Sequence, residues 1–377
     1  MSVASSHLFK PFVLGDIGKL EHRVVMAPLT RLRNNKAGEP TELAVEYYSQ
    51  RSSVPGTLII AEGTFPSLEA SGIPGSPGLW TEGQIKSWRK VTDKVHANGC
   101  IIIAQIYAAG SAADPADLSE KGVPFVNVSA FHWEPAHEKP RALSKAEIKD
   151  YVTRFGVAAR NAVQGAGFDG VELHFGNGYL MDNFLQTISN TRSDEYGGSV
   201  ENRIRFALES LEAMVQAVGP KRVGFRVSPW SRFQGMRMPD TDIIETFSTL
   251  FMHIRDAHPD LAFAHVIQPR ISGGKDDEGA DHWQSSDLPD AFLHSIWKPR
   301  PYIAAGGFTG ESASKRADTT GDLIAFGRFF ISNPDLPIRL QKQISLTFYD
   351  RSTFYGGAAT GYTDFPFAAS EDKHVSL

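Results

Sequence analysis

Short apolar runs alternate along the chain with longer stretches in which apolar residues recur at helical spacing. The short runs carry β-branched or aliphatic residues at successive positions, which is typical of strands that are covered on both faces. These runs are Val24–Pro28, Thr57–Glu62, Cys100–Gln105, Gly170–His174, Arg222–Val227, Leu261–Gln268, Pro301–Ala305 and Leu323–Gly327. The pattern predicts eight strands in a sheet that is buried on both sides.

A helix is predicted after each of these strands. Capping signals mark some of the boundaries: Ser144 with Glu147 forms a capping-box pattern, and Gly219-Pro220 ends another helix. The predicted helices are Thr41–Ser52, Gly83–Ala97, Lys145–Gln164, Glu201–Val218, Asp242–Ala257, Leu288–Trp297, Glu311–Ala317 and Asp335–Gln343. Eight strand–helix units predict a single (β/α)8 TIM barrel, in which catalytic groups lie where the strands end.

We interpret residues 1–377 as one domain with two additions. Residues 110–143 are rich in Pro and Ala and weakly periodic, so we expect an insertion after the third strand, a small hairpin or lid over the catalytic face. A C-terminal extension is expected from about residue 345 to residue 377.

An open, doubly wound sheet would use the same alternation of strands and helices. Gly165–Gly170 matches G-x-G-x-x-G, the pattern of a dinucleotide-binding loop. That loop requires a strand before it and a helix after it. Here the predicted order is reversed, and we therefore interpret the motif as a tight turn between a helix and a strand.

Composition and charge exclude several classes of function. The 377 residues include 38 Lys and Arg against 43 Asp and Glu, a formal net charge of −5, so no basic excess points to nucleic acid or to a membrane surface. The only cysteine is Cys100, which excludes internal disulfides and cysteine-rich metal sites and fits a reducing compartment. No apolar stretch approaches the roughly 18–20 residues of a membrane span, and we see no signal peptide. We expect a cytoplasmic protein without nucleic-acid or membrane partners.

Residues at the strand ends indicate a site for an anionic organic cofactor. Glycines 306, 307 and 327 would let backbone N–H groups approach a phosphate, and Arg328 can pair with it bidentately. The alternative is a glycine-lined corner with a surface arginine. Arg226 lies inside an apolar strand, where its charge requires an anionic ligand or a structural carboxylate. No lysine ends a strand, and neither paired carboxylates nor metal-ligand spacing is found, so the chemistry is expected from a cofactor.

Four motifs resemble the signatures of the old yellow enzyme family, and the resemblance runs from about Leu8 to about Pro366. They look closest to fungal members, including those of ergot-alkaloid pathways. The motifs are Met26–Arg31, His174–Leu180, Asn190–Arg203 and Gly327–Leu336. The resemblance implies an FMN-dependent ene-reductase. In such an enzyme NADPH or NADH reduces the flavin, which then reduces the C=C bond of an α,β-unsaturated aldehyde or ketone.

The resemblance also implies roles for single residues. His174 and Asn177 match the pair that binds the substrate carbonyl oxygen, as an oxyanion hole does. Tyr179 matches the donor that protonates the α-carbon while flavin N5 delivers hydride to the β-carbon. The positions that match flavin contacts are Pro28, Thr30, Gly63, Gln105, Arg226, Gly306, Gly307, Gly327 and Arg328. Further candidates for contact with the substrate, which ordinary core packing would also explain, are Tyr107, Phe233 and Tyr355.

Several features leave alternatives open. Phe175-Gly176 replaces the usual small pair before Asn177, Gly307 stands where relatives often have asparagine, and Gln268 replaces a residue that is often acidic. A dedicated reductase or isomerase of one alkaloid-type aldehyde in secondary metabolism is a second hypothesis, although a competent Tyr179 favours net reduction. A flavin-binding protein without turnover is a third. We expect a monomer or homodimer.

Overall fold

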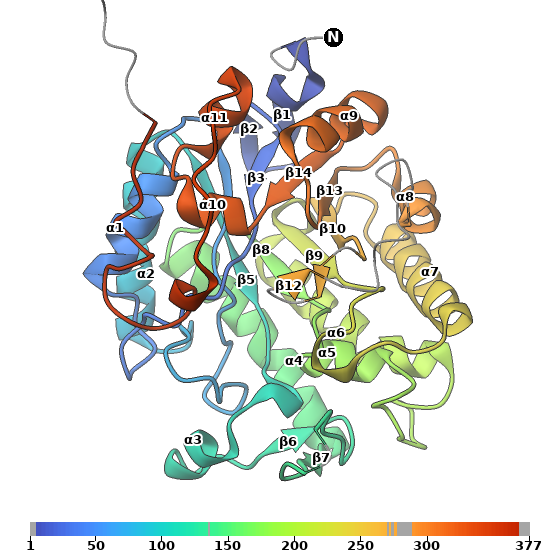
Figure 1. The fold of residues 1–377 in the computed structure, drawn as a ribbon. Coiled ribbons are helices and arrows are strands. Elements are labelled where there is room, and N and C mark those ends of the chain that lie inside the picture. Colours follow the sequence, from blue (N-terminus) through green and yellow to red (C-terminus); the bar gives the residue numbers. More distant parts are fainter. Residues whose placement is uncertain (1–4, 135, 270, 273–274, 277–288, 369–377) are drawn as a thin grey trace, which may run out of the picture.

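The structure is a computed structural model that describes residues 5–134, 136–269, 271–272, 275–276 and 289–368. At its centre eight parallel strands form a closed barrel (Figure 1). In order around the barrel they are β3 (Val24–Met26), β4 (Leu58–Ile60), β5 (Ile101–Ile106), β8 (Gly170–His174), β9 (Val223–Val227), β10 (Phe263–Ile267), β13 (Tyr302–Ala305) and β14 (Leu323–Phe326). Pairing of β14 with β3 closes the circle. The predicted (β/α)8 barrel is confirmed.

The barrel strands lie within the predicted apolar runs, except that β5 extends one residue further, to Ile106. Side chains of a strand alternate between two faces, and here both faces are buried. Val25 and Leu58 belong to a cluster inside the barrel, whereas Val24 and Ile59 belong to the larger cluster that includes the surrounding helices. This two-sided burial explains why the runs are continuously apolar.

A short antiparallel hairpin covers the end of the barrel at which the strands begin. It consists of β1 (Phe12–Leu14) and β2 (Gly18–Leu20). Leu14 and Leu20 are fully buried and join the interior cluster. The Asp16 N–H donates to the carbonyl of Lys221, just before β9 begins. The sequence pattern did not predict this hairpin, because Gly18–Leu20, its second strand, has a single large apolar residue and does not form an apolar run.

Helices surround the barrel as expected (Figure 1). The capping box of Ser144 and Glu147 is present at the start of α4, as predicted. The helices that match predicted ones are α1 (Glu42–Arg51), α2 (Glu82–Ala97), α4 (Lys145–Arg160), α6 (Val200–Val218), α7 (Asp240–Ala257), α8 (Ala291–Trp297), α9 (Gly310–Thr320) and α11 (Leu336–Lys342). Three short ones were not predicted: α3 (Pro115–Glu120), α5 (Leu180–Leu185) and α10 (Arg328–Ser332). Leu288, the predicted start of the helix that ends at Trp297, lies outside the described residues.

The turn at Gly165–Gly170 follows a helix and leads into a strand. A π-helical turn, Asn161–Gly165, continues α4, and β8 begins at Gly170. Gly167 has a φ of +78° in between. The interpretation of this glycine motif as a helix-to-strand turn is therefore confirmed.

Residues 110–143 form irregular structure after β5. They contain a 3-10 turn (Gly110–Ala112), α3 (Pro115–Glu120), β6 (Val126–Asn127) and β7 (Arg141–Ala142). In Figure 1 these elements lie at the opposite end of the molecule from β1 and β2. The two strands pair in parallel, so the expected hairpin is wrong: the chain between them returns to run in the same direction.

The chain after α11 has little regular structure, with one 3-10 turn at Arg351–Thr353. Residues 369–377 of the predicted extension lie outside the described part. Among the helices that the structure describes, none combines the length and the apolarity needed to cross a membrane.

Candidate active site

A buried polar layer lies inside the barrel on β5, β8, β9 and β10. Gln105 Nε2 donates to Glu172 Oε1 at 2.7 Å, and Glu172 Oε2 lies 2.6 Å from His265 Nδ1. Arg226 is the strand neighbour of His265 in the barrel and is 8% exposed. Sequence reasoning selected Gln105 and Arg226 but missed Glu172 and His265. An ionisable residue inside an apolar strand, the signal that identified Arg226, would also have found these two.

Arg226 keeps its charge in this buried setting. Burial lowers the pKa of its guanidinium to about 10, while the nearby Glu172 carboxylate opposes that shift. The Nε atom of Arg226 is buried and has no hydrogen-bond partner among the described residues. A buried donor of this kind is costly unless a bound molecule accepts from it. Arg226 therefore lies near a structural carboxylate, that of Glu172, and its Nε–H can still donate to a bound ligand.

His174 ends β8 beside Arg226. Burial, with the charges of Arg226 and His265 adding to it, lowers the pKa of His174 well below its usual value. The imidazole is therefore neutral at pH 7 and carries a single N–H. Its Nδ1 is buried and, in the part of the chain that the structure describes, has no hydrogen-bond partner.

Tyr179 lies next to His174. Its ring centroid is 5.6 Å from that of His174 and 4.7 Å from that of Tyr107. Burial, together with the nearby Tyr355, raises the pKa of Tyr179 to about 12, and the charge of Arg226 opposes the shift. The phenol is thus protonated at neutral pH. The structure brings together four predicted site residues here: His174, Tyr179, Tyr107 and Arg226.

Side-chain hydrogen bonds hold the backbone of the loop between His174 and Tyr179. Asn177 and Gly178 both have positive φ, +59° and +73°. The Asn177 N–H donates to Ser228 Oγ at 2.7 Å, and the Gly178 N–H donates to Asp182 Oδ2 at 2.9 Å. A Cβ atom on Gly178 would lie 3.1 Å from the Phe233 carbonyl, so Phe233 is also beside this loop.

The positions predicted to contact flavin lie at the ends of adjacent strands. Pro28 and Thr30 follow β3 and are half-buried, and Gly63 follows β4. A Cβ atom on Gly63 would lie 2.8 Å from the Tyr107 ring, so only glycine fits there without a shift. Gly306 (φ +116°) and Gly307 (φ +70°) follow β13. Gly306 is buried and Gly307 is exposed.

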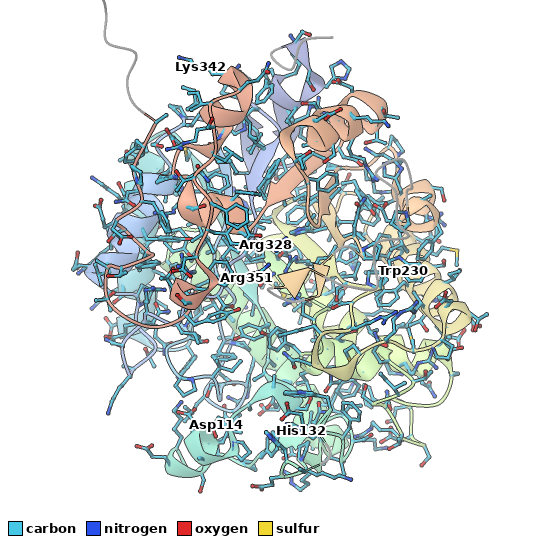
Figure 2. All side chains as sticks on the ribbon, in the orientation of Figure 1. Asp114, His132, Trp230, Arg328, Lys342 and Arg351 are labelled. Atoms are coloured by element: carbon cyan, nitrogen blue, oxygen red, sulfur yellow. The ribbon has the colours of Figure 1, made fainter. Side chains whose placement is uncertain are left out.

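Gly327 and Arg328 follow β14, which is the neighbour of β13 in the barrel. Gly327 precedes α10, and Arg328 is its first residue. The guanidinium of Arg328 lies over the Tyr349 ring at 5.2 Å, as does that of Arg351 at 5.3 Å. Figure 2 shows these two arginines close together. The predicted glycines and Arg328 are thus gathered at the ends of two neighbouring strands.

Two arginines that follow β3 hold the C-terminal segment, a role that sequence reasoning missed. Arg31 donates to the carbonyls of Phe354 (2.8 Å) and Gly361 (2.7 Å), and Arg33 donates to those of Thr353, Phe354, Ala358 and Thr360. Tyr355, in the segment held this way, is 55% exposed, and its influence on the pKa of Tyr179 puts it near that residue. Nothing in the sequence pattern links residues so far apart in the chain.

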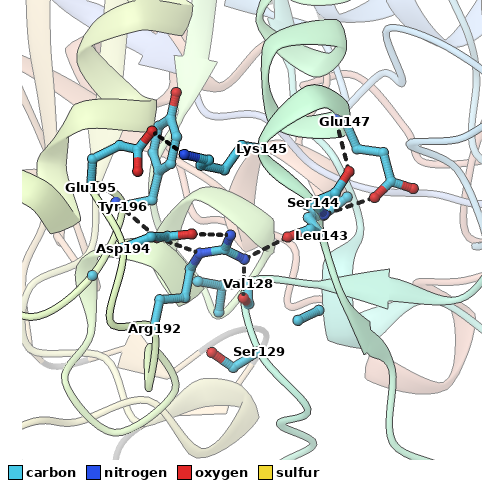
Figure 3. A network of polar contacts seen from close by, with 12 residues as sticks. Val128, Ser129, Leu143, Ser144, Lys145, Glu147, Arg192, Asp194, Glu195 and Tyr196 are labelled. Atoms are coloured by element: carbon cyan, nitrogen blue, oxygen red, sulfur yellow. Dashed lines mark hydrogen bonds and ion pairs between the residues drawn. The ribbon is translucent and has the colours of Figure 1, made fainter.

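The third sequence motif anchors residues 110–143. Arg192 donates to the carbonyls of Val128 (2.9 Å) and Leu143 (2.7 Å) and pairs bidentately with Asp194, with contacts of 3.0 and 2.7 Å (Figure 3). Ser129 Oγ accepts from the N–H of Thr191. One guanidinium therefore joins two separate points of the insertion to the loop before α6.

Within the described ranges, no three His, Cys, Asp or Glu side chains are grouped so that they could hold a metal ion. The site instead offers a buried cation, glycines at two strand ends, a neutral imidazole and a protonated phenol. The buried Nε donor of Arg226 and the buried Nδ1 atom of His174, which have no hydrogen-bond partner among the described residues, fit a ligand that is anionic and carries polar ring or carbonyl atoms. A flavin mononucleotide has both properties.

Comparison with known proteins finds relatives that match nearly the whole chain. NADP-dependent oxidoreductase lnbE of Aspergillus flavus is 44% identical over 99% of this chain and 98% of its own length. Chanoclavine-I aldehyde reductase fgaOx3 of Penicillium roqueforti is 44% identical and covers 98% of both chains. Probable inactive dehydrogenase easA of Claviceps fusiformis is 41% identical over 97% of this chain and 96% of its own.

Among solved structures, the Old Yellow Enzyme from Pichia sp. AKU4542 superposes with a TM-score of 0.88. It is 33% identical, over 97% of this chain and 95% of the other. The family model described as NADH:flavin oxidoreductase / NADH oxidase, an FMN family, matches residues 7–347. These matches confirm the resemblance to old yellow enzymes, and the chain belongs to the FMN-dependent NADH:flavin oxidoreductase / NADH oxidase family.

Proposed function

We propose that this oxidoreductase is an ene-reductase, which uses NADPH or NADH to reduce the activated C=C bond of an α,β-unsaturated aldehyde or ketone. The observation that carries the proposal is the grouping of a neutral His174, a protonated Tyr179 and a charged Arg226 where β8 and β9 end. A donor to a carbonyl oxygen, a proton source and a cation are the groups that such a reduction requires from the protein.

FMN would be held at the strand ends by Pro28, Thr30, Gly63, Gln105, Arg226, Gly306, Gly307, Gly327 and Arg328. When bound, FMN would supply the redox chemistry, the transfer of hydride from the reduced nicotinamide to the β-carbon of the acceptor. Backbone N–H groups of the glycines and the Arg328 guanidinium would bind the phosphate. Arg226 would stabilise negative charge on the ring system, because its own charge is buried and only partly offset by Glu172.

His174 and Asn177 would bind the carbonyl oxygen of the substrate. A neutral His174 can donate one hydrogen bond without losing a proton, and the Asn177 side-chain amide can donate another. Negative charge develops on that oxygen as the C=C bond is reduced. Two donors aimed at it stabilise the transition state more than the ground state, and water is largely excluded at the buried His174.

Tyr179 would protonate the α-carbon. Its pKa of about 12 means that the proton is present at any physiological pH, and the neighbouring Arg226 charge stabilises the tyrosinate that remains after transfer. Tyr107, which contacts the Tyr179 ring edge-on, and the nearby Phe233 and Tyr355 would form the walls against which the substrate lies.

A dedicated reductase of one alkaloid-type aldehyde in secondary metabolism is the second candidate. The observation in its favour is the 44% identity to a chanoclavine-I aldehyde reductase over nearly the whole chain. Tyr179 favours net reduction over isomerisation, because an isomerase works better without a competent proton donor. The presence of His174, Asn177 and Tyr179 together disfavours a flavin-binding protein without turnover.

The test is to purify the protein, identify its flavin and mix the reduced protein anaerobically with a panel of enals and enones. We expect FMN to be released on denaturation and the enones to reoxidise the protein while forming saturated carbonyl products. Reoxidation by a single aldehyde would favour the second candidate. FAD in the supernatant, or no flavin after reconstitution, would contradict both.

A further inference from the structure

Asn183, a fully buried residue of α5, uses both ends of its side-chain amide. Its Nδ2 donates to the carbonyl of Gly178 at 2.8 Å. Its Oδ1 accepts from Ser111 Oγ at 2.8 Å and from Asn127 Nδ2 at 2.7 Å. Ser111 and Asn127 come from two separate elements of the insertion, the 3-10 turn and β6. Asn183 is therefore the link between the insertion and the loop before Tyr179.

The carbonyl that Asn183 holds belongs to the peptide group that joins Gly178 to Tyr179. The N–H of the same glycine is held by Asp182, the residue next to Asn183. Asn177 and Gly178 both have positive φ, a conformation that asparagine tolerates better than most other non-glycine residues, and the Asn177 N–H is held by Ser228 Oγ. The orientation of Asn177 and Tyr179 thus depends on this pair of side chains from α5.

The insertion determines which way the Asn183 amide points. The Nδ2 group of Asn127 can only donate, so the oxygen of Asn183 must face it. The nitrogen of Asn183 then faces the Gly178 carbonyl, as that acceptor requires. Without the donors from the insertion, the oxygen of Asn183 would lose both of these partners, and the amide would be held in this orientation less firmly, by its bond to the Gly178 carbonyl.

Hydrogen bonds and close packing attach the insertion to the rest of the chain, which fixes its position next to α5. Arg192 binds the carbonyls of Val128 and Leu143 (Figure 3). The Leu180 N–H donates to the carbonyl of Ala108, just before the insertion begins. A Cβ atom on Gly110 would lie 2.9 Å from the Leu180 Cα, so the two segments are in close contact.

We propose that Asn183 is a positioning residue through which the insertion, residues 110–143, orients Asn177 and Tyr179 toward the substrate. This inference rests on the proposed function, since it assigns the insertion a part in placing the proton donor and one donor to the carbonyl oxygen. Ser111 and Asn127 act on the substrate only through Asn183.

The experiment compares FMN-loaded wild type with Asn183→Leu, Ser111→Ala and the double variant. Ser119→Ala is the matched control, because Ser119 is an exposed serine of the same insertion, on α3. Phenol affinity is measured by titrating the flavin absorbance. The rate of reoxidation by cyclohexenone is measured by stopped flow. Hydrogen exchange of residues 176–180 reports on the loop without any ligand.

We expect Asn183→Leu to weaken phenol binding and slow reoxidation by about 10- to 100-fold, and Ser111→Ala by about 2- to 10-fold, in line with the loss of buried hydrogen bonds. Hydrogen exchange of residues 176–180 should be faster in Asn183→Leu and in Ser111→Ala than in wild type. Ser119→Ala should match wild type, and FMN affinity should not change in any of them. In the Asn183→Leu background, Ser111→Ala should add no further effect, because its only route to the site is gone.

Unchanged phenol affinity, reoxidation rate and exchange in Ser111→Ala would overturn the inference, and so would additive effects in the double variant. If Asn183→Leu does not fold or does not bind FMN, the milder Ser111→Ala still tests the inference, through hydrogen exchange of residues 176–180 and through phenol affinity. A wild type that releases no FMN or ignores enones would contradict the proposed function. The exchange comparison would then still test whether the insertion controls this loop.

Discussion

The two ends of the barrel are closed in opposite ways. At the end where the strands begin, the hairpin of β1 and β2 inserts Leu14, Ile17 and Leu20 among the apolar residues of the barrel interior. Where the strands end, the interior holds Glu172 and Arg226 instead, and the Nε atom of Arg226 and the Nδ1 atom of His174 have no hydrogen-bond partner among the described residues. The first end is an ordinary core that stabilises the fold. The second carries polar groups whose energetic cost is recovered only when a ligand binds.

The largest effect that we expect from a single change is at the second end. Tyr179→Phe removes the proton donor but keeps the ring that packs on Tyr107. Reoxidation of the reduced protein by an enone should slow by about 10²–10⁴-fold, the usual loss for one positioned general acid. Flavin reduction by NADPH should be almost unchanged, because it needs no proton on carbon. Stopped-flow traces of the two half-reactions separate these effects. An unchanged enone rate would mean that another group supplies the proton.

At the first end, a change should affect stability alone. Leu20→Ala removes a fully buried side chain from the interior cluster and should lower the free energy of unfolding by about 2–5 kcal/mol. Denaturant titration measures this loss. The rate of enone reduction per bound FMN should stay at the wild-type value. A large drop in that rate would show that the two ends are not independent.

The first end should also respond to acid through His22, which lies just before β3. Its ring contacts Thr57 Oγ1 at 3.1 Å, and burial lowers its pKa to about 4 from an ordinary value of 6.5. Below pH 6.5 His22 is protonated in the unfolded chain, whereas in the folded chain it stays neutral down to about pH 4. The free energy of unfolding should therefore fall between pH 6.5 and 4, by roughly 3 kcal/mol in total. His22→Gln should reduce the pH dependence over this range by that amount, whereas the buried His174 and His265, whose pKa values are also lowered, keep their own contributions. A wild-type profile in His22→Gln would exclude His22 as its source.

The smallest of these effects concerns the ligand. Arg226→Ala should weaken FMN binding by about 1.5–3 kcal/mol, the usual contribution of a charge-assisted hydrogen bond, or make the bound flavin harder to reduce. Equilibrium dialysis and a redox titration measure the two outcomes. Arg226→Lys is the control, because it keeps the charge without the guanidinium fork. If Arg226→Ala retains both affinity and potential, Arg226 has no part in binding the flavin.

The difference between the two ends also explains what could be predicted from the sequence. The eight barrel strands were predictable because burial on both faces leaves continuous apolar runs such as Val24–Pro28. The hairpin that closes the first end was not, because Gly18–Leu20, its second strand, has a single large apolar residue and forms no apolar run. The parallel pairing of β6 with β7 depends on how residues 128–140 return, which no local pattern encodes.

The site shows the same limit. His174, Asn177 and Tyr179 were found because they form one short motif after a strand. Glu172 and His265 were missed because the candidates came mainly from the strand ends, and both of these residues lie inside strands. The link from Ser111 and Asn127 through Asn183 could not be predicted, since it joins three segments that meet only in the folded chain.

The central claim is that the end where the strands finish reduces a C=C bond with a nicotinamide as the source of hydride and Tyr179 as the source of the proton. Isotope labelling of the product tests it most directly. Cyclohexenone is reduced once with NADPH deuterated at the transferable position in H2O, and once with unlabelled NADPH in D2O. The account predicts deuterium at the β-carbon in the first product and at the α-carbon in the second. A saturated product without label at the β-carbon in the first experiment, or no reduction at all by the FMN-loaded protein, would contradict it.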